Sequence, residues 1–449
     1  MGKKPAQRPN EAKYGMALYG AAWPEGEYFF VCGGGGHGLV NRIVWGRYRD
    51  GRCSDQLGDY KLGKETPMRM LICPWGSSLL VGNANGGIRR LQIGSDDSAE
   101  HKPKLVEVSA AFQESLAGIP GEVAAMRFNS RGNMLAVSFR ENSTVQVIAY
   151  PSMKELVAWK LDDPEVKDVD FCPHTAAAAI LQQQQQQQPS GAELLATVGG
   201  NGVCRVWEVR ANQQQLVATL EPPKDKAKCV FARCCWARSG QPLLFALVNY
   251  RMGKDLGSYL VAYGPPEGPG KPWPLLKKVK ANNSPASAMD ISKHGEWIAA
   301  GYSDGMLRVY HSDTLMMKSE AMASIAFVSS VSFNADNSAV IAVGGDANCY
   351  VMETVARREA GIGAAVRSLL LFLLLCLAAA ALLHFYQHPE ALPYTALQYL
   401  QQYHKRPDIA QRCSSNEGAL PLQPHACEWL QRAAEVLPDE LYRQQRDEL

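Results

Sequence analysis

Short apolar segments alternate with polar turns through the first 355 residues of the chain. Four of the turns contain glycine and are followed by a segment in which apolar and polar residues alternate, as in GGNGVCRVWEV from Gly199. Such alternation is typical of a half-buried strand, and Asn-Gly or Asp-Gly pairs supply the positive φ angles of a type I′ turn. We therefore predict type I′ hairpins at Asn85-Gly86, Asn201-Gly202 and Asp304-Gly305.

These hairpins belong to a unit that recurs every 45–60 residues or so, roughly the period of a propeller blade. Each unit consists of a strand, a polar turn, a strand, a glycine-rich hairpin and a further strand. Four-stranded blades of this kind bury their core against neighbouring blades and leave few free edges. We predict an all-β, seven-bladed WD-repeat-like β-propeller over residues 17–356, preceded by an N-terminal segment, residues 1–16. The predicted blades begin near Leu18, Met68, Val123, Val166, Cys229, Ala286 and Ser329.

The repeats are degenerate, because no unit carries a full Gly-His…Trp-Asp signature. Trp207 is the nearest match to the tryptophan that usually ends a blade. The fourth unit also contains a run of seven glutamines, Gln182–Gln188. A polar homopolymer cannot bury enough apolar surface to fold, so we predict a flexible loop over residues 182–188.

One apolar stretch is too long for a strand. Between Ser368 and Phe385, the segment SLLLFLLLCLAAAALLHF contains only two polar residues, Ser368 and His384. A helix of this length covers about 27 Å, which is close to the hydrocarbon thickness of the endoplasmic reticulum (ER) membrane. A buried core helix is the alternative, but the residues that follow are too polar to surround it. We predict a single transmembrane helix over residues 364–385.

The charges beside this helix predict its orientation. Three arginines, at positions 357, 358 and 367, precede the apolar stretch that begins at Ser368, whereas no Lys or Arg follows it until Lys405. Positive residues stay on the cytosolic side, so we expect a cytosolic propeller and a small lumenal tail over residues 386–449. The tail ends in a tetrapeptide that resembles the Lys-Asp-Glu-Leu retrieval signal, which a receptor reads in the lumen. Its residues are Arg446, Asp447, Glu448 and Leu449.

Twelve cysteines are distributed along the chain without a Cys-x-x-Cys pair. The nine before residue 360 mostly have apolar neighbours, so we interpret them as small core residues in a reducing compartment rather than as metal ligands. Cys413 and Cys427 would lie in the oxidising lumen, where they are able to form a disulfide. The net charge is +2, and no recognition helix, zinc-ligand spacing or basic stripe is present, so nucleic-acid binding is not expected.

Residues 28–44, YFFVCGGGGHGLVNRIV, place four glycines between two apolar strands. The segment satisfies the G-x-G-x-x-G pattern of a dinucleotide site, but such a site needs a following helix whose N-terminus holds the pyrophosphate. LVNRIVWGRYR alternates as a strand instead, which argues against an enzyme of that kind. We interpret the segment as a long loop of the first blade, where binding residues are commonly placed, or as a merely elongated hairpin.

The start of the chain resembles the Sec-twelve / prolactin regulatory element-binding protein family. The resemblance rests on LYGAAW (Leu18–Trp23), an apolar strand, four glycines and then Gly-Leu-Val-Asn, and it extends to the plan of nearly the whole chain. The family acts as guanine-nucleotide exchange factor for the Sar-type small GTPase that starts COPII vesicle formation and ER-to-Golgi transport. The resemblance therefore implies an exchange factor of the ER membrane that has this GTPase, and other COPII components, as partners.

The exchange loop of that family has four glycines, a few variable residues and then Gly-Ile-x-Asn. The resemblance implies a potassium ion at this loop, although exchange itself requires no cofactor and no covalent chemistry, so no catalytic residue is assigned. An apolar side chain would contact the GTPase. The asparagine would either bond a switch segment of the GTPase or brace the loop internally, and we favour bracing because Asn commonly bonds nearby backbone in turns. The corresponding residues here are Gly33, Gly34, Gly35, Gly36, Gly38, Leu39 and Asn41.

The glycine loop departs from the family pattern in its length. Only His37 separates Gly36 from Gly38, where the family generally has several residues. Relatives of the same architecture aid the ER exit of membrane cargo without exchange activity. The alternative function is therefore a WD-repeat trafficking adaptor that does not exchange nucleotide, and exchange by substoichiometric amounts of the protein distinguishes the two functions.

Overall fold

The computed structural model describes ten stretches of the chain and a few isolated positions between residues 381 and 432. The chain divides into two compact units, Met1–Ala356 and Arg357–Leu449, and all of the described strands belong to the first unit. The ten described stretches are residues 8–35, 38–84, 86–96, 102–108, 121–183, 192–223, 229–238, 240–253, 255–268 and 270–354.

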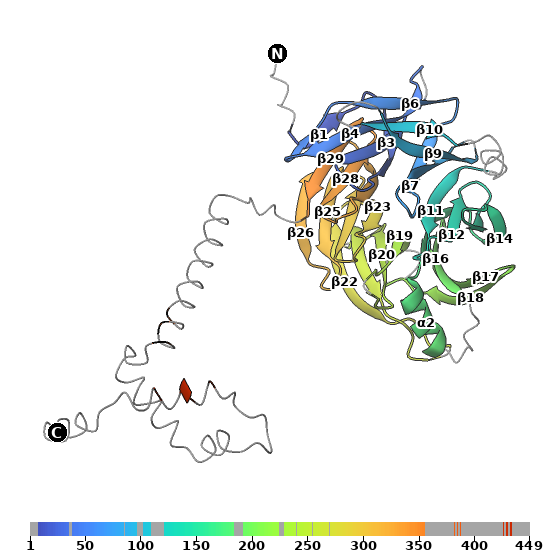
Figure 1. Ribbon diagram of the computed structural model, residues 1–449. Coiled ribbons are helices and arrows are strands. Elements are labelled where there is room, and N and C mark those ends of the chain that lie inside the picture. Colours follow the sequence, from blue (N-terminus) through green and yellow to red (C-terminus); the bar gives the residue numbers. More distant parts are fainter. Residues whose placement is uncertain are drawn as a thin grey trace. The chain divides into compact units, whose positions relative to one another are not determined.

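The strands of the first unit form seven antiparallel sheets, each of which is one blade of a propeller (Figure 1). The first strand of every blade contacts the first strand of the next blade, so that seven inner strands close a ring. This confirms the seven-bladed β-propeller that the repeats predict. Five of the predicted blade starts coincide with the first residue of an inner strand, and the other two, Met68 and Ser329, fall one residue later.

Blades 1 to 4 follow one another along the chain, with the inner strand first in each. Blade 1 contains β2 (Leu18–Ala22), β3 (Tyr28–Gly33), β4 (Asn41–Arg49), β5 (Arg52–Cys53) and β6 (Gly58–Gly63). Blade 2 contains β7 (Pro67–Ile72), β8 (Ser78–Asn83), β9 (Ile88–Ser95) and β10 (Pro103–Glu107). Blade 3 contains β11 (Val123–Phe128), β12 (Met134–Phe139), β13 (Thr144–Ala149) and β14 (Lys154–Lys160). Blade 4 contains β15 (Val166–Phe171), β16 (Glu193–Gly199), β17 (Cys204–Arg210) and β18 (Gln213–Leu220).

Blades 5 to 7 complete the ring. Blade 5 contains β19 (Cys229–Trp236), β20 (Leu244–Tyr250), β21 (Gly257–Tyr263) and β22 (Leu275–Asn282). Blade 6 contains β23 (Ala286–Ile291), β24 (Trp297–Tyr302), β25 (Met306–His311) and β26 (Met317–Met322). Blade 7 contains β27 (Val328–Phe333), β28 (Ala339–Gly344), β29 (Asn348–Glu353) and β1 (Glu11–Lys13).

The seventh blade takes its outer strand from the other end of the unit. Strand β1 pairs antiparallel with β29, with Glu11 opposite Tyr350 (Figure 1). A backbone hydrogen bond from the Val351 amide to the Asn10 carbonyl, at 3.0 Å, extends the pairing. The propeller therefore includes residues of the segment 1–16 that the sequence analysis sets apart from it.

The hydrophobic core is divided into seven clusters, one between each pair of neighbouring blades. Eight of the nine described cysteines are buried in these clusters, and the other, Cys53, is half-buried. Burial raises the pKa of Cys32 and of Cys53 to about 12, so both thiols stay protonated at neutral pH. The interpretation of these cysteines as small core residues is confirmed. Cys413 and Cys427, the predicted disulfide pair, lie outside the described residues.

The three predicted hairpins exist, but the predicted type I′ turn is wrong in two of them, while Asn85 of the third lies outside the described residues. Gly202 and Gly305 have positive φ angles of 77° and 83°, whereas Asn201 and Asp304 do not belong to the residues with positive φ. In each turn the glycine amide closes the turn by a bond to the carbonyl three residues earlier, at 3.0 and 3.1 Å. The preceding side chain accepts a bond from the backbone two residues on, as in Val203 N to Asn201 Oδ1 at 3.0 Å. This local bond favours the ordinary turn conformation, so only the glycine is left-handed.

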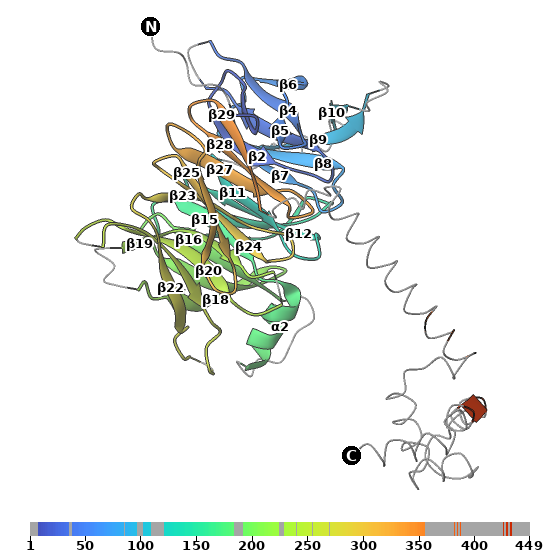
Figure 2. The same cartoon turned by 90° about the vertical axis from the view of Figure 1, so that its left-hand side faces the viewer.

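A helix that the sequence analysis did not predict lies between β15 and β16. Helix α2 (His174–Gln183) packs its alanines and Ile180 into the cluster between blades 4 and 5, beside β16 (Figure 2). The first two residues of the glutamine run end this helix. The remaining glutamines, 184–188, lie outside the described residues.

Other predictions also fall outside the described residues. The transmembrane helix over residues 364–385, the lumenal tail and the retrieval signal at Arg446–Leu449 belong to this group, apart from isolated positions. Among the helices that the structure describes, none is both long and apolar enough to cross a bilayer.

Candidate functional site

The glycine segment connects the second and third strands of blade 1. Strand β3 ends at Gly33 and β4 begins at Asn41, with Gly33 paired to Arg42 in the last rung of the ladder. The inner strand β2 starts opposite the same rung, since Leu18 pairs with Gly33. The glycine loop therefore leaves the ring at the end where the inner strands begin. Gly36 and His37 lie outside the described residues.

The first glycines are required by close contacts within the chain. A Cβ atom on Gly33 would lie 1.9 Å from the Ala17 carbonyl oxygen, and one on Gly34 would lie 2.3 Å from Asn41 Oδ1. Gly34 and Gly35 also have φ angles of 145° and 105°, which residues other than glycine rarely adopt. These glycines let the loop pack against its own blade, rather than against a partner surface.

Asn41 braces the loop from inside. Its Oδ1 accepts a hydrogen bond from the Gly35 amide, and its Nδ2 donates to the Gly63 carbonyl, both at 3.2 Å. The loop is held further by the Gly34 amide, which donates to the Ala17 carbonyl at 3.1 Å. Of the two roles considered for Asn41 from the sequence, the structure shows internal bracing.

The far part of the loop is exposed. Leu39 and Val40 each keep 49% of their surface accessible, and nothing lies within 4 Å of the position of a Cβ atom on Gly38. The loop thus has a braced base and an apolar tip, Leu39 and Val40. The exposed Leu39 agrees with the apolar contact that the resemblance implies.

A second apolar segment lies at the same end of the ring, and the sequence analysis missed it. Ile325 is 85% exposed and Phe327 is 44% exposed, and both directly precede the inner strand β27. Blade 7 adjoins blade 1, where Ser329 Oγ donates a bond of 2.6 Å to the Leu18 carbonyl. The signal in the sequence is the apolar pair in SIAF, which falls between two strands where polar turn residues are expected.

Three oxygens at the base of the loop each accept one hydrogen bond and keep a second lone pair. Asn41 Oδ1 accepts the Gly35 amide, the Gly34 carbonyl accepts the Tyr19 hydroxyl at 3.3 Å, and the Gly63 carbonyl accepts Asn41 Nδ2. The potassium ion stays a prediction that rests on the resemblance alone. In the described part of the chain, His, Cys, Asp and Glu side chains form no group that could hold a metal ion.

Comparison with known proteins agrees with the propeller fold. The family described as WD domain, G-beta repeat matches residues 273–311, which span the last strand of blade 5 and the first three strands of blade 6. SEC12-like protein 2 of Arabidopsis thaliana is 25% identical to the chain over 295 residues, which are 65% of each protein. The chain is therefore similar to a Sec12-like protein and contains a WD repeat. It spans just under two thirds of the length of the relative that it matches.

The degenerate repeats of this protein keep part of the hydrogen bonding that the tryptophan of a blade supplies. In blade 4, Trp207 Nε1 donates to Thr197 Oγ1 at 2.9 Å, across neighbouring strands. In the matched repeat, the Tyr310 hydroxyl instead bonds the Tyr302 hydroxyl and the Ala281 carbonyl, both at 2.9 Å. In blade 6, Tyr310 thus takes the place that Trp207 has in blade 4, and the repeat still matches the WD-repeat family.

Proposed function

We propose that this protein is a membrane-anchored guanine-nucleotide exchange factor for a Sar-type small GTPase. The observation that carries the proposal is the glycine loop of blade 1, with its braced base and exposed apolar tip, in a Sec12-like propeller. Exchange needs no covalent chemistry. The propeller would dock the switch segments of the GTPase and favour the nucleotide-free form.

The energies required fit an apolar docking surface at this end of the ring. An acceleration of nucleotide release by about 10³–10⁵-fold corresponds to roughly 4–7 kcal/mol of differential affinity. Leu39 and Val40 are half exposed, so covering the rest of each is worth about 1 kcal/mol. The tip alone is therefore insufficient. Covering Ile325 and Phe327 adds about 3 kcal/mol, and these contacts accelerate release only to the extent that they form with the nucleotide-free GTPase and not with the nucleotide-bound one.

The remaining parts of the proposal concern residues outside the described stretches. The segment 364–385 would anchor the propeller in the ER membrane, where the activated GTPase starts COPII assembly. The lumenal tail would carry the Arg446–Leu449 signal to a retrieval receptor. The anchor keeps the exchange activity on the membrane at which the GTPase is needed.

The test is GDP release from the Sar-type GTPase of the same organism, measured with the full chain reconstituted in vesicles. Wild-type protein at substoichiometric amounts should accelerate release. Leu39→Ser should slow this accelerated release by about fivefold or more, because it removes about 1 kcal/mol of apolar contact and adds a desolvated hydroxyl. The matched control is Leu216→Ser, on the outer strand β18 of blade 4, where Leu216 is 46% exposed.

Two outcomes would contradict the proposal. If wild-type protein does not accelerate GDP release at any amount, exchange is not the function. If the Leu39→Ser variant accelerates GDP release from the GTPase as much as the wild type and the Leu216→Ser control do, exchange takes place elsewhere on the protein.

A trafficking adaptor without exchange activity is the second candidate. The observation that favours it is the self-contained loop: Gly34, Gly35 and Asn41 all use their hydrogen-bonding groups within blade 1. Because these groups already form hydrogen bonds within the chain, the base of the loop has less freedom to move when it contacts a GTPase. In this case cells that lack the protein would export membrane cargo slowly, and the Leu39→Ser variant would restore export fully, while the purified protein would leave GDP release unchanged.

A further inference from the structure

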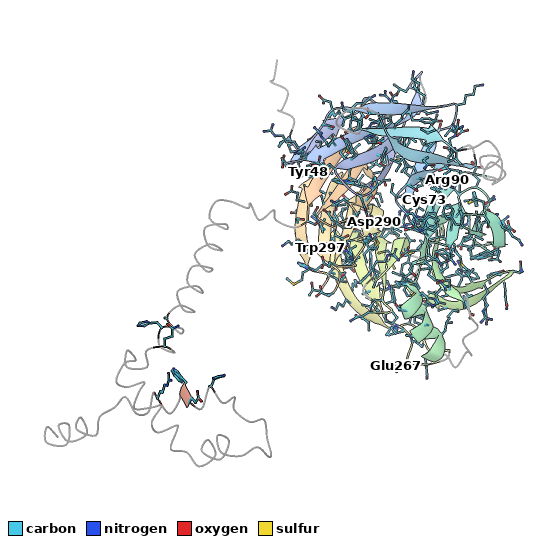
Figure 3. All side chains as sticks on the ribbon, viewed as in Figure 1. Tyr48, Cys73, Arg90, Glu267, Asp290 and Trp297 are labelled. Carbon is cyan, nitrogen blue, oxygen red and sulfur yellow. The ribbon has the colours of Figure 1, made fainter. Side chains whose placement is uncertain are left out.

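The inner strands of the seven blades surround a central cavity of about 700 Å³. Its walls come from β2, β7, β11, β15, β19, β23 and β27, and from the turns that follow several of them. We call this cavity the central channel. Asp290, labelled in Figure 3, lies on β23 and lines it. A volume of this size is typical of a small-molecule site, so the charge of the walls decides which ligand the channel would accept.

The walls of the channel are strongly cationic. Only two acidic residues line it, Asp168 and Asp290, against seven basic residues. The basic residues are Arg69, Arg127, Arg131, Lys167, Arg233, Arg238 and Lys293.

The two lining carboxylates already have structural partners. Asp168 Oδ2 accepts the Cys234 amide of the next blade at 3.1 Å, and Asp290 Oδ2 accepts the Phe333 amide of the next blade at 3.1 Å. These bonds hold neighbouring inner strands together. Burial raises the pKa of both carboxyl groups, and Arg127 acts in the opposite direction on each of them.

Several of the basic residues are neutralised by carboxylates behind the wall. Arg238 Nη2 bonds both oxygens of Asp170 at 2.8 and 3.0 Å, and Arg131 pairs with Glu193 at 2.6 Å. Lys167 lies 3.8 Å from Glu165. These cations are part of the scaffold, as is Arg127, whose Nε lies 4.0 Å from Asp170 Oδ1. Arg69, Arg233 and Lys293 remain, and the first two lie on inner strands.

Arg69 and Arg233 have no carboxylate within ion-pair distance among the residues that the structure describes. Arg69 donates only to backbone, from Nε to the Ala124 carbonyl at 2.7 Å and from Nη1 to the Met68 carbonyl at 2.8 Å. Arg233 Nη1 donates to the Ala232 carbonyl at 2.9 Å. Each guanidinium therefore keeps N–H groups for a ligand, while Asp168 acts on both arginines from beyond ion-pair distance.

The two arginines are placed by the same backbone device. Every inner strand has an irregularity in its register near its start, and Arg69 on β7 and Arg233 on β19 directly follow it. Bulges of this kind redirect side chains and are common beside functional sites. The charges also act on one another: burial, followed by the cations Arg233 and Arg140, lowers the pKa of Arg69 to about 10. Two like charges that repel across a confined space favour an anion between them.

We propose that the central channel binds a small phosphate-bearing anion between Arg69 and Arg233. Guanidinium groups match phosphate oxygens with two parallel N–H···O bonds, and they are the preferred partners of phosphate in proteins. The bound anion would link blade 2 to blade 5 across the ring and neutralise the repulsion between the two arginines. This site is separate from the glycine loop, and it does not depend on the proposed exchange function.

The test is equilibrium dialysis of the full chain, in detergent micelles, against radiolabelled inorganic pyrophosphate. Wild-type protein should bind one pyrophosphate per chain, more weakly as the salt concentration rises, and its thermal midpoint should rise with pyrophosphate. Arg69→Gln should weaken binding about tenfold or more, since it removes a charge-assisted contact, whereas Arg69→Lys should retain most of it. The matched control is Arg49→Gln, at a surface arginine whose side chain is 61% exposed, and it should bind as the wild type does.

Three results would overturn the proposal: no binding to the wild type, no change of its thermal midpoint, or equal losses in Arg69→Gln and Arg49→Gln. If circular dichroism shows that Arg69→Gln does not fold, Arg233→Gln replaces it with the same expected loss. Vesicles that contain phosphatidylinositol 4-phosphate then identify the source of the phosphate. Displacement of pyrophosphate by the vesicles indicates a lipid headgroup, and its retention indicates a soluble phosphate ester.

Discussion

Replacing Asn41 by alanine should release the base of the glycine loop without disturbing the propeller core. The substitution removes two hydrogen bonds of 3.2 Å, one that accepts the Gly35 amide and one that donates to the Gly63 carbonyl. A net contribution of about 0.5–1.5 kcal/mol for each bond gives a loss of about 1–3 kcal/mol. Because the bonds are local, the loss should be confined to the opening of the loop and should raise it about 5- to 150-fold.

The assay is amide hydrogen exchange at Gly35, followed by mass spectrometry of peptides from the loop. Protection should fall by the factor given above in Asn41→Ala, while amides of the core strand β16 keep theirs. Asn41→Asp is the matched variant, since its carboxylate still accepts the Gly35 amide but cannot donate to Gly63 at neutral pH, so it should lose about half of the effect. Unchanged protection in Asn41→Ala would refute the bracing role of Asn41.

Three further predictions concern the scaffold. Gly33→Ala should lower the free energy of unfolding, measured by chemical denaturation, by about 1–3 kcal/mol, because its Cβ would lie 1.9 Å from the Ala17 carbonyl oxygen. Gly94→Ala, whose Cβ would lie 3.7 Å from the Lys104 carbonyl oxygen, should not. Asp170→Asn should cost about 3–5 kcal/mol in the same assay, since Asp170 is fully buried and ion-paired with Arg238. Burial raises the pKa of Asp290, so the contribution of Asp290 to stability is fully present below the ordinary value of 3.8 and is lost as the pH rises through the raised pKa. Asp290→Asn should remove this part of the curve of unfolding free energy against pH. An unchanged curve would contradict the prediction.

The architecture of the propeller could be predicted from the sequence because local patterns specify it. Alternating segments and glycine turns mark each blade, and the inner strands begin within one residue of the predicted positions. Strand β1 escaped prediction because three residues, Glu11–Lys13, carry no measurable periodicity, and only their pairing with β29 makes them a strand. Helix α2 escaped because its alanines directly precede the glutamine run, whose composition dominates the local pattern.

The candidate site was predictable only in part. The glycines and Leu39 stand out because such residues are unusual between two apolar strands. The contact between Asn41 and Gly63 joins residues 22 positions apart, and nothing in the local pattern indicates it. The same holds for Arg69 and Arg233, which lie on different blades and line one cavity only when the ring is folded. The periodicity of the sequence does not predict which residues come together when the ring closes.

The pairing of β1 with β29 has a consequence for synthesis of the protein. Asn10 and its partner Val351 are 341 positions apart, so at about 5–20 residues per second the early segment waits tens of seconds for its partner strand. Throughout that time blade 7 does not exist and the inner faces of blades 1 and 6 are uncovered. The apolar surfaces of Leu18 and Phe29 on blade 1, and of Leu307 once blade 6 is made, are then open to chaperones or to other nascent chains. Ring closure is thus the last step of folding, and it sets the period in which the newly made propeller is vulnerable to aggregation.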